Sequence, residues 1–336
     1  MDPRLPLREI PAYARRIEAM GFDGLHVAET IHDALAVSLL VAEHTERLTI
    51  RTSVALAFVR SPTLTAYAAW DLSAFSGGRF ELGLGTQIRQ NITERMAMPW
   101  SPPVARLREY LDVLDALYEA FRTGEAPHVE GDVYAVTRLQ PYFNPGPDAA
   151  TTAPPTWLGG VNTGVCELAG ERAAGFVTHP TNSDPRYLEA IALPSLRTGA
   201  DRAGRPVPTV VAGATVITGR DDAAVAAERE RQRRMFAFLY STPAYRRTLE
   251  LYGWDDLAGD LQALVRADRW DDLPALVTDE LLDTLVPAGR HDELAPVLLD
   301  RYDGLADGLL LGPQGDPADD ESVATLVAAL RGTAGR

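Results

Sequence analysis

The chain of 336 residues is poor in cysteine and in positive charge, and it has no long hydrophobic run. Its single cysteine, Cys166, excludes an internal disulfide and a cysteine-rich metal site, and it suits a reducing cytoplasm. Lysine and arginine number 32 against 47 aspartates and glutamates, and the net charge of −15 would repel phosphates. No apolar run reaches transmembrane length, and residues 1–4 do not begin a signal peptide. We therefore expect a cytoplasmic protein that handles small molecules and binds neither nucleic acid nor membrane.

Histidine is scattered rather than clustered. None of the six shows the paired spacing of a zinc-binding helix, so we expect no metal site. They are His26, His32, His44, His128, His179 and His291.

Short apolar segments typical of strands alternate with longer helical segments along the whole chain, a pattern that predicts a parallel sheet. The expected strands are 24–28, 48–58, 79–85, 156–159, 175–179, 209–217 and 308–312. The expected helices are 7–20, 33–45, 62–75, 102–122, 164–174, 185–203, 221–240, 291–303 and 322–331, and 243–286 is expected to be helical.

This alternation and the chain length predict a TIM-like (β/α)8 barrel with helical insertions. We expect one domain over 1–331, with a helical insertion at about 221–303 and a frayed tail at 332–336. The first barrel strand is missing from the pattern, because few residues precede the helix at 7–20. That strand lies in 1–6, or the barrel is incomplete, or the start of the chain is assigned wrongly.

The active site of such a barrel lies at the carboxyl ends of its strands, so the residues there are candidates for binding. Gly159 and Gly160 lead directly into a helix beginning near Asn162, where free amides and the helix dipole favour an anion. The alternative is a tight turn that binds nothing. Gly83-Leu84-Gly85 lacks the third glycine of a dinucleotide-binding fingerprint, so a Rossmann fold is disfavoured.

Four side chains at or just after these strand ends are candidates for acid–base chemistry or for structural roles. Glu29 ends an apolar strand, and its carboxylate is either a catalytic or hydroxyl-binding group or a cap for the next turn. His32 and Asp33 have the character of helix-capping residues. His179 is either a ligand contact or a structural histidine.

Several motifs together resemble the bacterial luciferase-like superfamily. They are Gly21-Phe22-Asp23-Gly24, the run 76–86 that begins Ser-Gly-Gly-Arg-Phe-Glu, and the run 169–176 that reads Ala-Gly-Glu-Arg-Ala-Ala-Gly-Phe. Other motifs resemble its actinobacterial branch assigned to coenzyme F420: Glu29-Thr30-Ile31-His32-Asp33, Arg60-Ser61-Pro62, Met98-Pro99-Trp100-Ser101, the run 241–246 and Tyr252-Gly253-Trp254. Each motif is weak alone, but their number and order are specific.

The resemblance implies a barrel that binds F420 or FMN with the ring in its mouth. It implies a non-proline cis peptide at Ser53–Val54, which supports the ring together with Ala55, and a phosphate site on the loop from Gly159 to Thr163. The implied cofactor-binding residues are Thr30, Ser53, Val54, Ala55, Gly85, Thr86, Gln87, Asn91, Gly159, Gly160, Val161, Asn162 and Thr163. It also implies a homodimer.

The chain departs from the members of the superfamily that oxidise sugar phosphates or alcohols. Those members carry an acidic residue followed by histidine at the second strand end, where this chain has Glu29-Thr30. The sugar-phosphate enzymes also have a glutamate where Ile88 stands. A sugar-phosphate dehydrogenase is therefore disfavoured. We expect Glu29 to hydrogen-bond the ring or the substrate, and His32 or His179 to supply a proton.

The resemblance implies hydride transfer between the C5 atom of the deazaflavin and a C=C, C=N or C=O bond of a small organic substrate. We expect an F420-dependent oxidoreductase, most simply a reductase. One alternative is a luciferase-like monooxygenase that uses reduced FMN and oxygen with a separate reductase. A second alternative is a barrel that binds a ligand without catalysis.

Overall fold

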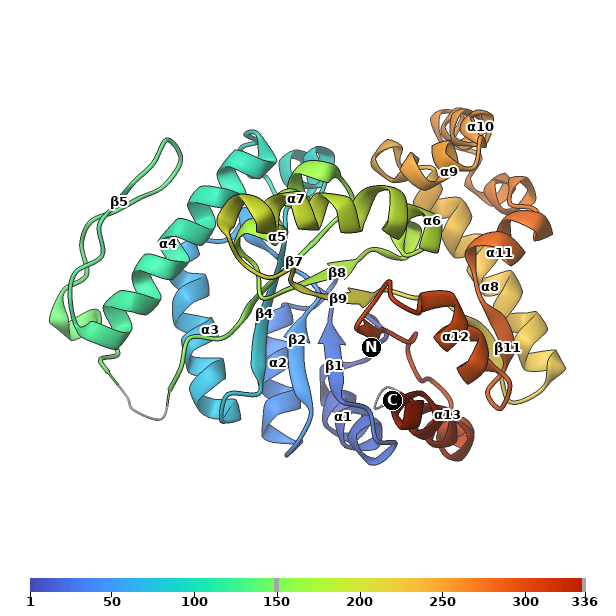
Figure 1. Cartoon of the computed structure of the whole chain (residues 1–336), viewed down its shortest axis with the longest axis horizontal. Coiled ribbons are helices and arrows are strands. Elements are labelled where there is room, and N and C mark those ends of the chain that lie inside the picture. Colours follow the sequence, from blue (N-terminus) through green and yellow to red (C-terminus); the bar gives the residue numbers. More distant parts are fainter. Residues whose placement is uncertain (148–150, 334–336) are drawn as a thin grey trace.

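A curled parallel sheet forms the centre of the molecule in a computed structural model that describes residues 1–147 and 151–333 (Figure 1). Its strands follow the order β1 (Gly24–Val27), β2 (Thr49–Thr52), β4 (Phe80–Gly85), β7 (Thr156–Gly160), β8 (Gly175–Thr178), β9 (Thr209–Ala212) and β12 (Gly308–Leu309). All neighbouring pairs are parallel, and β3 (Ala55–Leu56) also pairs with β4. The predicted parallel α/β architecture is confirmed.

The sheet is a half-barrel with two ends, β1 and β12. Residues 1–6 form no strand, so the interpretation that places the first barrel strand there is wrong. The predicted strand 48–58 is interrupted, because β2 ends at Thr52 and β3 begins at Ala55. A 3-10 turn at Ala57–Val59 completes this stretch.

Helices cover the outer face of the sheet, where the apolar strand residues are buried in one large core. The first four are α1 (Ile10–Ala19), α2 (Ala34–Glu43), α3 (Pro62–Ser76) and α4 (Pro103–Thr123). They are followed by α5 (Thr163–Arg172), a helical run from α6 (Pro185–Tyr187) to α7 (Leu193–Ala203), α12 (Leu294–Tyr302) and α13 (Asp320–Thr333). The N-terminus of α2 is capped as expected, since the Asp33 carboxylate accepts the amide hydrogens of Leu35 and Ala36.

An insertion between β9 and α12 forms a separate helical body, drawn in yellow and orange at the right of Figure 1. It contains α8 (Asp222–Tyr240), α9 (Arg247–Leu251), α10 (Asp255–Arg266) and α11 (Asp279–Leu285), and it has its own hydrophobic core. A parallel ladder of β10 (Ile217–Gly219) and β11 (Ala288–Arg290) connects it to the barrel. The predicted strand 209–217 is thus two strands, and β11 was not predicted.

The ends of the insertion differ from the sequence-based expectation. Helix α12 packs into the main core rather than into the insertion, so the inserted body ends near β11. Residues 332 and 333 of the expected frayed tail belong to α13, and 334–336 lie outside the described residues. Residues 148–150 of the expected loop 141–155 also lie outside them.

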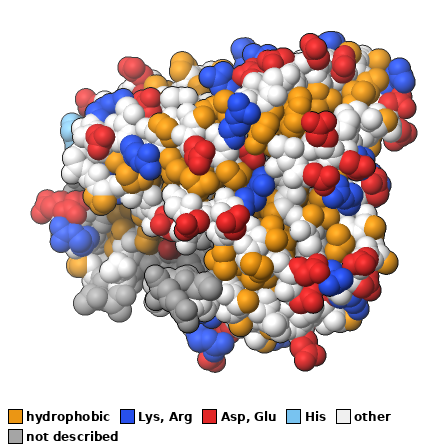
Figure 2. All heavy atoms as spheres, turned by 45° about the vertical axis from the view of Figure 1, so that its right-hand side comes forward, with side chains coloured by type: hydrophobic (Ala, Val, Ile, Leu, Met, Phe, Trp, Pro, Cys, Tyr) orange, Lys and Arg blue, Asp and Glu red, His pale blue; other side chains and the backbone are white. Residues whose placement is uncertain are grey.

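A small antiparallel hairpin of β5 (Val129–Glu130) and β6 (Ala135–Val136) projects from the left of Figure 1. On the face that carries the insertion, acidic and basic side chains are interspersed with hydrophobic ones (Figure 2). Within residues 1–147 and 151–333, no helix is long and apolar enough to cross a membrane.

Candidate active site

Successive side chains of a strand point to opposite faces, and the inner face of the half-barrel begins with a polar plug at its amino end. The plug consists of His26, Arg51, Glu81 and Trp157. The Arg51 guanidinium donates to the Glu81 carboxylate and to His26 Nε2, and it stacks on the Trp157 ring at 3.3 Å. Burial and the Arg51 charge lower the pKa of His26 to about 3. The plug fills the amino end, which leaves the carboxyl end for a ligand.

Closer to the carboxyl ends of the strands, the inner face of the sheet carries glycines rather than larger side chains. A Cβ atom added at Gly85 would lie 2.4 Å from Val54 Cγ2, and one added at Gly159 would lie 2.7 Å from Val54 Cγ1. The Val54 side chain therefore occupies the space that side chains on β4 and β7 would take. Together with Trp157, Val177, Val211 and Leu310 it forms an apolar cluster.

The segment that presents Val54 is tied to β1. The Ser53–Val54 peptide is cis, as the resemblance predicted. The Ser53 amide donates to Val27 O at 2.7 Å, and the Glu29 amide donates to Val54 O at 3.4 Å. The next residue, Ala55, is buried in β3.

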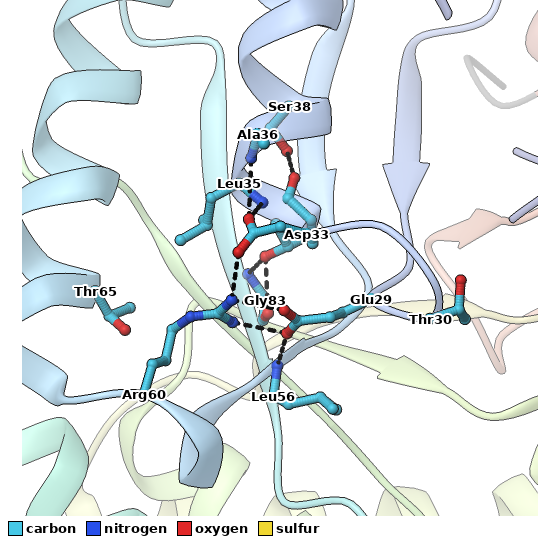
Figure 3. A network of polar contacts seen from close by, with 12 residues as sticks. Glu29, Thr30, Asp33, Leu35, Ala36, Ser38, Leu56, Arg60, Thr65 and Gly83 are labelled. Carbon is cyan, nitrogen blue, oxygen red and sulfur yellow. Dashed lines mark hydrogen bonds and ion pairs between the residues drawn. The ribbon is translucent and has the colours of Figure 1, made fainter. Parts of the chain in front are cut away.

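The Glu29 carboxylate is held by donors on both oxygens (Figure 3). Arg60 binds it through two guanidinium nitrogens, at 2.7 Å to Oε2 and 2.6 Å to Oε1. The Leu56 amide donates to Oε2 at 2.6 Å, and the Glu29 side chain is 10% exposed. Arg60 also binds Asp33 Oδ2 at 2.7 Å. This arrangement fastens β3 and the end of β1 to the start of α3.

Two loops at the carboxyl edge are joined by Arg95, whose guanidinium donates to Thr30 O at 2.6 Å. The loop after β4 contains Thr86 and Gln87, which has a φ of 57°, and leads into a π-helical turn that starts at Asn91. In the β1–α2 loop, the Nε2 atom of His32 is buried and has no hydrogen-bond partner in the described part of the chain. A ligand group could meet that nitrogen.

The N-terminus of α5 begins directly after β7. The first amides of a helix have no partner within it. The Asn162 side chain accepts from the Val165 amide at 3.2 Å, which leaves the amides of Thr163 and Gly164 for an anion. The Val161 carbonyl is fixed by the Tyr187 hydroxyl at 2.7 Å. This geometry fits a phosphate group.

His179 follows β8 at the same edge and contacts the insertion. Its ring stacks on Tyr245 with centroids 4.4 Å apart and planes 11° apart. Its Nδ1 atom lies 2.8 Å from Thr181 Oγ1. Burial lowers the pKa of His179 to about 4, so the ring is neutral at pH 7.

All of the candidate residues therefore lie at or beside one edge of the sheet, in the loops after β1, β2, β4, β7 and β8. Their binding and catalytic roles remain predictions. Sequence reasoning did not identify Arg60 as the partner of Glu29, although it noted the Arg60-Ser61-Pro62 motif. It also gave no role to the insertion residues around His179, because nothing in their local sequence points to a residue 60 or more positions away.

The family model described as luciferase-like monooxygenase matches residues 2–308. An uncharacterized protein of Mycobacterium tuberculosis is 39% identical over 296 residues, which is 88% of this chain and 86% of that protein. The coenzyme F420-dependent tetrahydromethanopterin reductase from Methanopyrus kandleri matches with a TM-score of 0.79 and 20% identity over 98% of this chain and 96% of its own. The oxygenating constituent of 3,6-diketocamphane monooxygenase from Pseudomonas putida, in complex with FMN, matches with a TM-score of 0.69 and 16% identity over 99% and 96%. At 20% and 16% identity, the likeness to these two structures shows that the fold is shared.

Proposed function

Because the chain belongs to the luciferase-like monooxygenase family, we propose that it is an oxidoreductase that uses coenzyme F420 and transfers hydride to or from a small organic substrate. One observation carries the proposal. At the carboxyl edge of the sheet, an apolar floor contains Val54, Val177, Val211 and Leu310 together with Trp157 of β7, and β7 leads directly into the first amides of α5. A planar ring and a phosphate tail need this combination.

The residues present fit that cofactor. The apolar floor would support one face of the ring, and the Thr163 and Gly164 amides would bind the phosphate. Glu29 would act through Arg60 and the Leu56 amide by fixing the segment that carries Val54. The cofactor itself would supply hydride chemistry at C5 when bound.

The cofactor could instead be FMN, and the FMN-containing neighbour supports that alternative. The F420-dependent neighbour matches with the higher TM-score of the two and supports the deazaflavin. With FMN, the same pocket would permit monooxygenation. A reductase acting on a C=C, C=N or C=O bond is the form of the proposal that the sequence motifs favour.

Fluorescence titration of the purified protein with F420 and with FMN tests the proposal. Tight binding of F420 alone supports it, binding of FMN alone supports the monooxygenase, and binding of neither supports a barrel without this cofactor chemistry. The phosphate site has its own test in Thr163→Pro, because proline lacks the amide hydrogen but is favoured at the first position of a helix. Asn162 already has the extended conformation that a following proline requires (φ −131°, ψ 157°).

We expect Thr163→Pro to weaken F420 binding by about 10- to 100-fold, the value of one hydrogen bond to a charged group. The matched control Thr163→Ala keeps the amide and should lose far less. If Thr163→Pro and the wild type bind F420 equally well, the phosphate does not bind at the N-terminus of this helix.

We also propose a homodimer that buries the exposed apolar residues of α2 and α3. These helices pack side by side, and Leu39, Leu64 and Phe75 on them are 44%, 65% and 56% exposed. Exposed apolar residues gathered on neighbouring helices are typical of an interface between subunits. Leu64→Glu should shift the protein to monomers in sedimentation equilibrium, whereas a wild type that is already monomeric would exclude the dimer.

A further inference from the structure

A cavity of about 220 Å³ lies at the amino edge of the sheet, at the other end of the strands from the proposed cofactor site. Its lining includes Thr156, the first residue of β7, and Ala174, which directly precedes β8. Strand β7 runs from this edge to Gly160 at the carboxyl edge. The cavity is therefore separate from the candidate active site, and none of the residues named for that site lines it.

One face of α4 forms part of the cavity wall. Leu111, Asp115 and Tyr118 are four and three residues apart, a spacing that places them on the same side of a helix. Ala153 and Pro154, in the segment before β7, form another part of the wall. Leucine, alanine and proline present only carbon atoms from their side chains, so the cavity suits a ligand with an apolar portion.

The Tyr118 hydroxyl is a buried group without a partner. Tyr118 is 7% exposed, and its ring stacks on Trp70 with centroids 6.2 Å apart. Within residues 1–147 and 151–333, its hydroxyl forms no hydrogen bond. Burial raises the pKa of Tyr118 above that of an ordinary tyrosine, so the phenol keeps its proton and is a donor. Burying a hydroxyl without a partner costs free energy, and an acceptor in the cavity would remove that cost.

Two arginines line the same cavity, and one of them is already paired. The Arg172 guanidinium donates to Asp112 Oδ1 at 2.6 Å and to Asp115 Oδ2 at 2.7 Å. Arg205 is half-buried in the segment between α7 and β9, and in the described part of the chain its guanidinium forms no hydrogen bond or ion pair. Its backbone amide donates to Ala200 O at 3.1 Å, which holds the residue in place. A cation and a phenol hydroxyl that both lack an acceptor make a donor set for an anion.

We propose that this cavity binds a small carboxylate, whose oxygens accept from Arg205 and Tyr118 and whose carbon chain lies against the apolar wall. A single negative charge fits better than a phosphate dianion, because Asp115 also lines the cavity and the chain carries a net charge of −15. The volume of about 220 Å³ exceeds the ~30 Å³ that one water occupies in the liquid, so a molecule of several heavy atoms has room. The site goes beyond the proposed function and does not require the cofactor.

Isothermal titration calorimetry with butyrate tests the site, at constant ionic strength and without F420. We expect saturable binding of butyrate with one site per chain. Butyramide has nearly the same size and shape but no charge, and we expect it not to bind. Inorganic phosphate is the second probe, and we expect it to bind more weakly than butyrate because of its higher charge.

Two variants locate the bound carboxylate. Arg205→Gln and Tyr118→Phe should each weaken butyrate binding by about 10- to 100-fold, the value of one hydrogen bond to a charged group. Arg197→Gln is the matched control, because Arg197 is exposed on α7 and does not line the cavity; it should bind butyrate as the wild type does. Tyr118→Phe removes a hydroxyl that has no partner in the described residues, so the urea midpoint of the ligand-free variant should not fall.

Several results would overturn the proposal. They are the absence of saturable butyrate binding to the wild type, equal binding of butyramide, tighter binding of phosphate, and butyrate binding that both cavity variants retain. A lower urea midpoint for Tyr118→Phe would show that the hydroxyl is satisfied within the protein and would remove the reason for a ligand. Because these measurements contain no F420, their failure is distinguishable from failure of the proposed function.

Discussion

The contact between Val54 and Gly85 predicts that Gly85→Ala destabilises the protein and that Val54→Ala restores much of the loss. The added Cβ would lie 2.4 Å from Val54 Cγ2, where ordinary contacts are 3.4–4 Å, so one of the two must move by about 1 Å. Overpacking of this kind costs about 1–3 kcal/mol. Gly85 does not have a positive φ, so alanine gains about 0.4–1 kcal/mol by restricting the unfolded chain. We therefore expect a net loss of roughly 1–2 kcal/mol.

Val54→Ala removes both methyl groups from the contact and on its own should cost roughly 1–2 kcal/mol. In the double variant the new Cβ occupies vacated space, so the two losses should not add. Urea denaturation of the wild type, both single variants and the double variant measures the coupling. Gly312→Ala is the control, because a Cβ there meets nothing within 4 Å. Losses that add to within about 0.5 kcal/mol would refute the assigned contact.

The remaining predictions concern charge. Glu29→Gln should lower the free energy of unfolding by about 1.5–3 kcal/mol, because it leaves the half-buried Arg60 without its charged bidentate partner. Asp33→Asn keeps the α2 cap and should lower it by at most about 1 kcal/mol, and equal losses in urea denaturation would contradict this. Burial lowers the pKa of His179 from 6.5 to about 4, so its contribution to stability is present above pH 6.5 and is lost as the pH falls toward 4. Between pH 6.5 and pH 4, the free energy of unfolding of the wild type should fall by up to about 3 kcal/mol more than that of His179→Gln. Parallel pH profiles of the two proteins would exclude the lowered pKa of His179.

The sequence alone predicted the parallel strands and most of the helices, because their apolar periodicity and caps are local signals. Asp33, for example, caps α2 as expected. It did not predict β11 or the division of 209–217 into β9 and β10. The short strand at 288–290 is half-buried throughout, so it has no apolar run to mark it. It forms only because β10 lies parallel to it.

The candidate site shows the same division. Its residues could be named from their places after strands, because parallel strands bring their carboxyl ends to one edge. The hydrogen-bond and ion-pair partners of these residues could not be predicted from the sequence. Glu29 and Arg60 are 31 residues apart and could each have been free, but the fold makes them a pair. The structure also adds a contact that the sequence did not predict, since Gly85 and Gly159 both make room for Val54.

The sequence by itself determined the family, the alternation of strands and helices along the chain, and the loops that lie at the carboxyl edge of the sheet. Only the tertiary structure decided what the residues in those loops can do. The loop that carries His179 is held by Thr248 and Tyr240, which lie more than 60 positions after His179 and bind Thr181 and Asn182. The spacing of apolar residues along a helix or strand indicates which of its faces a residue occupies. The direction of a hydrogen bond depends on which distant donor occupies the acceptor, and that is set when the insertion packs against the barrel.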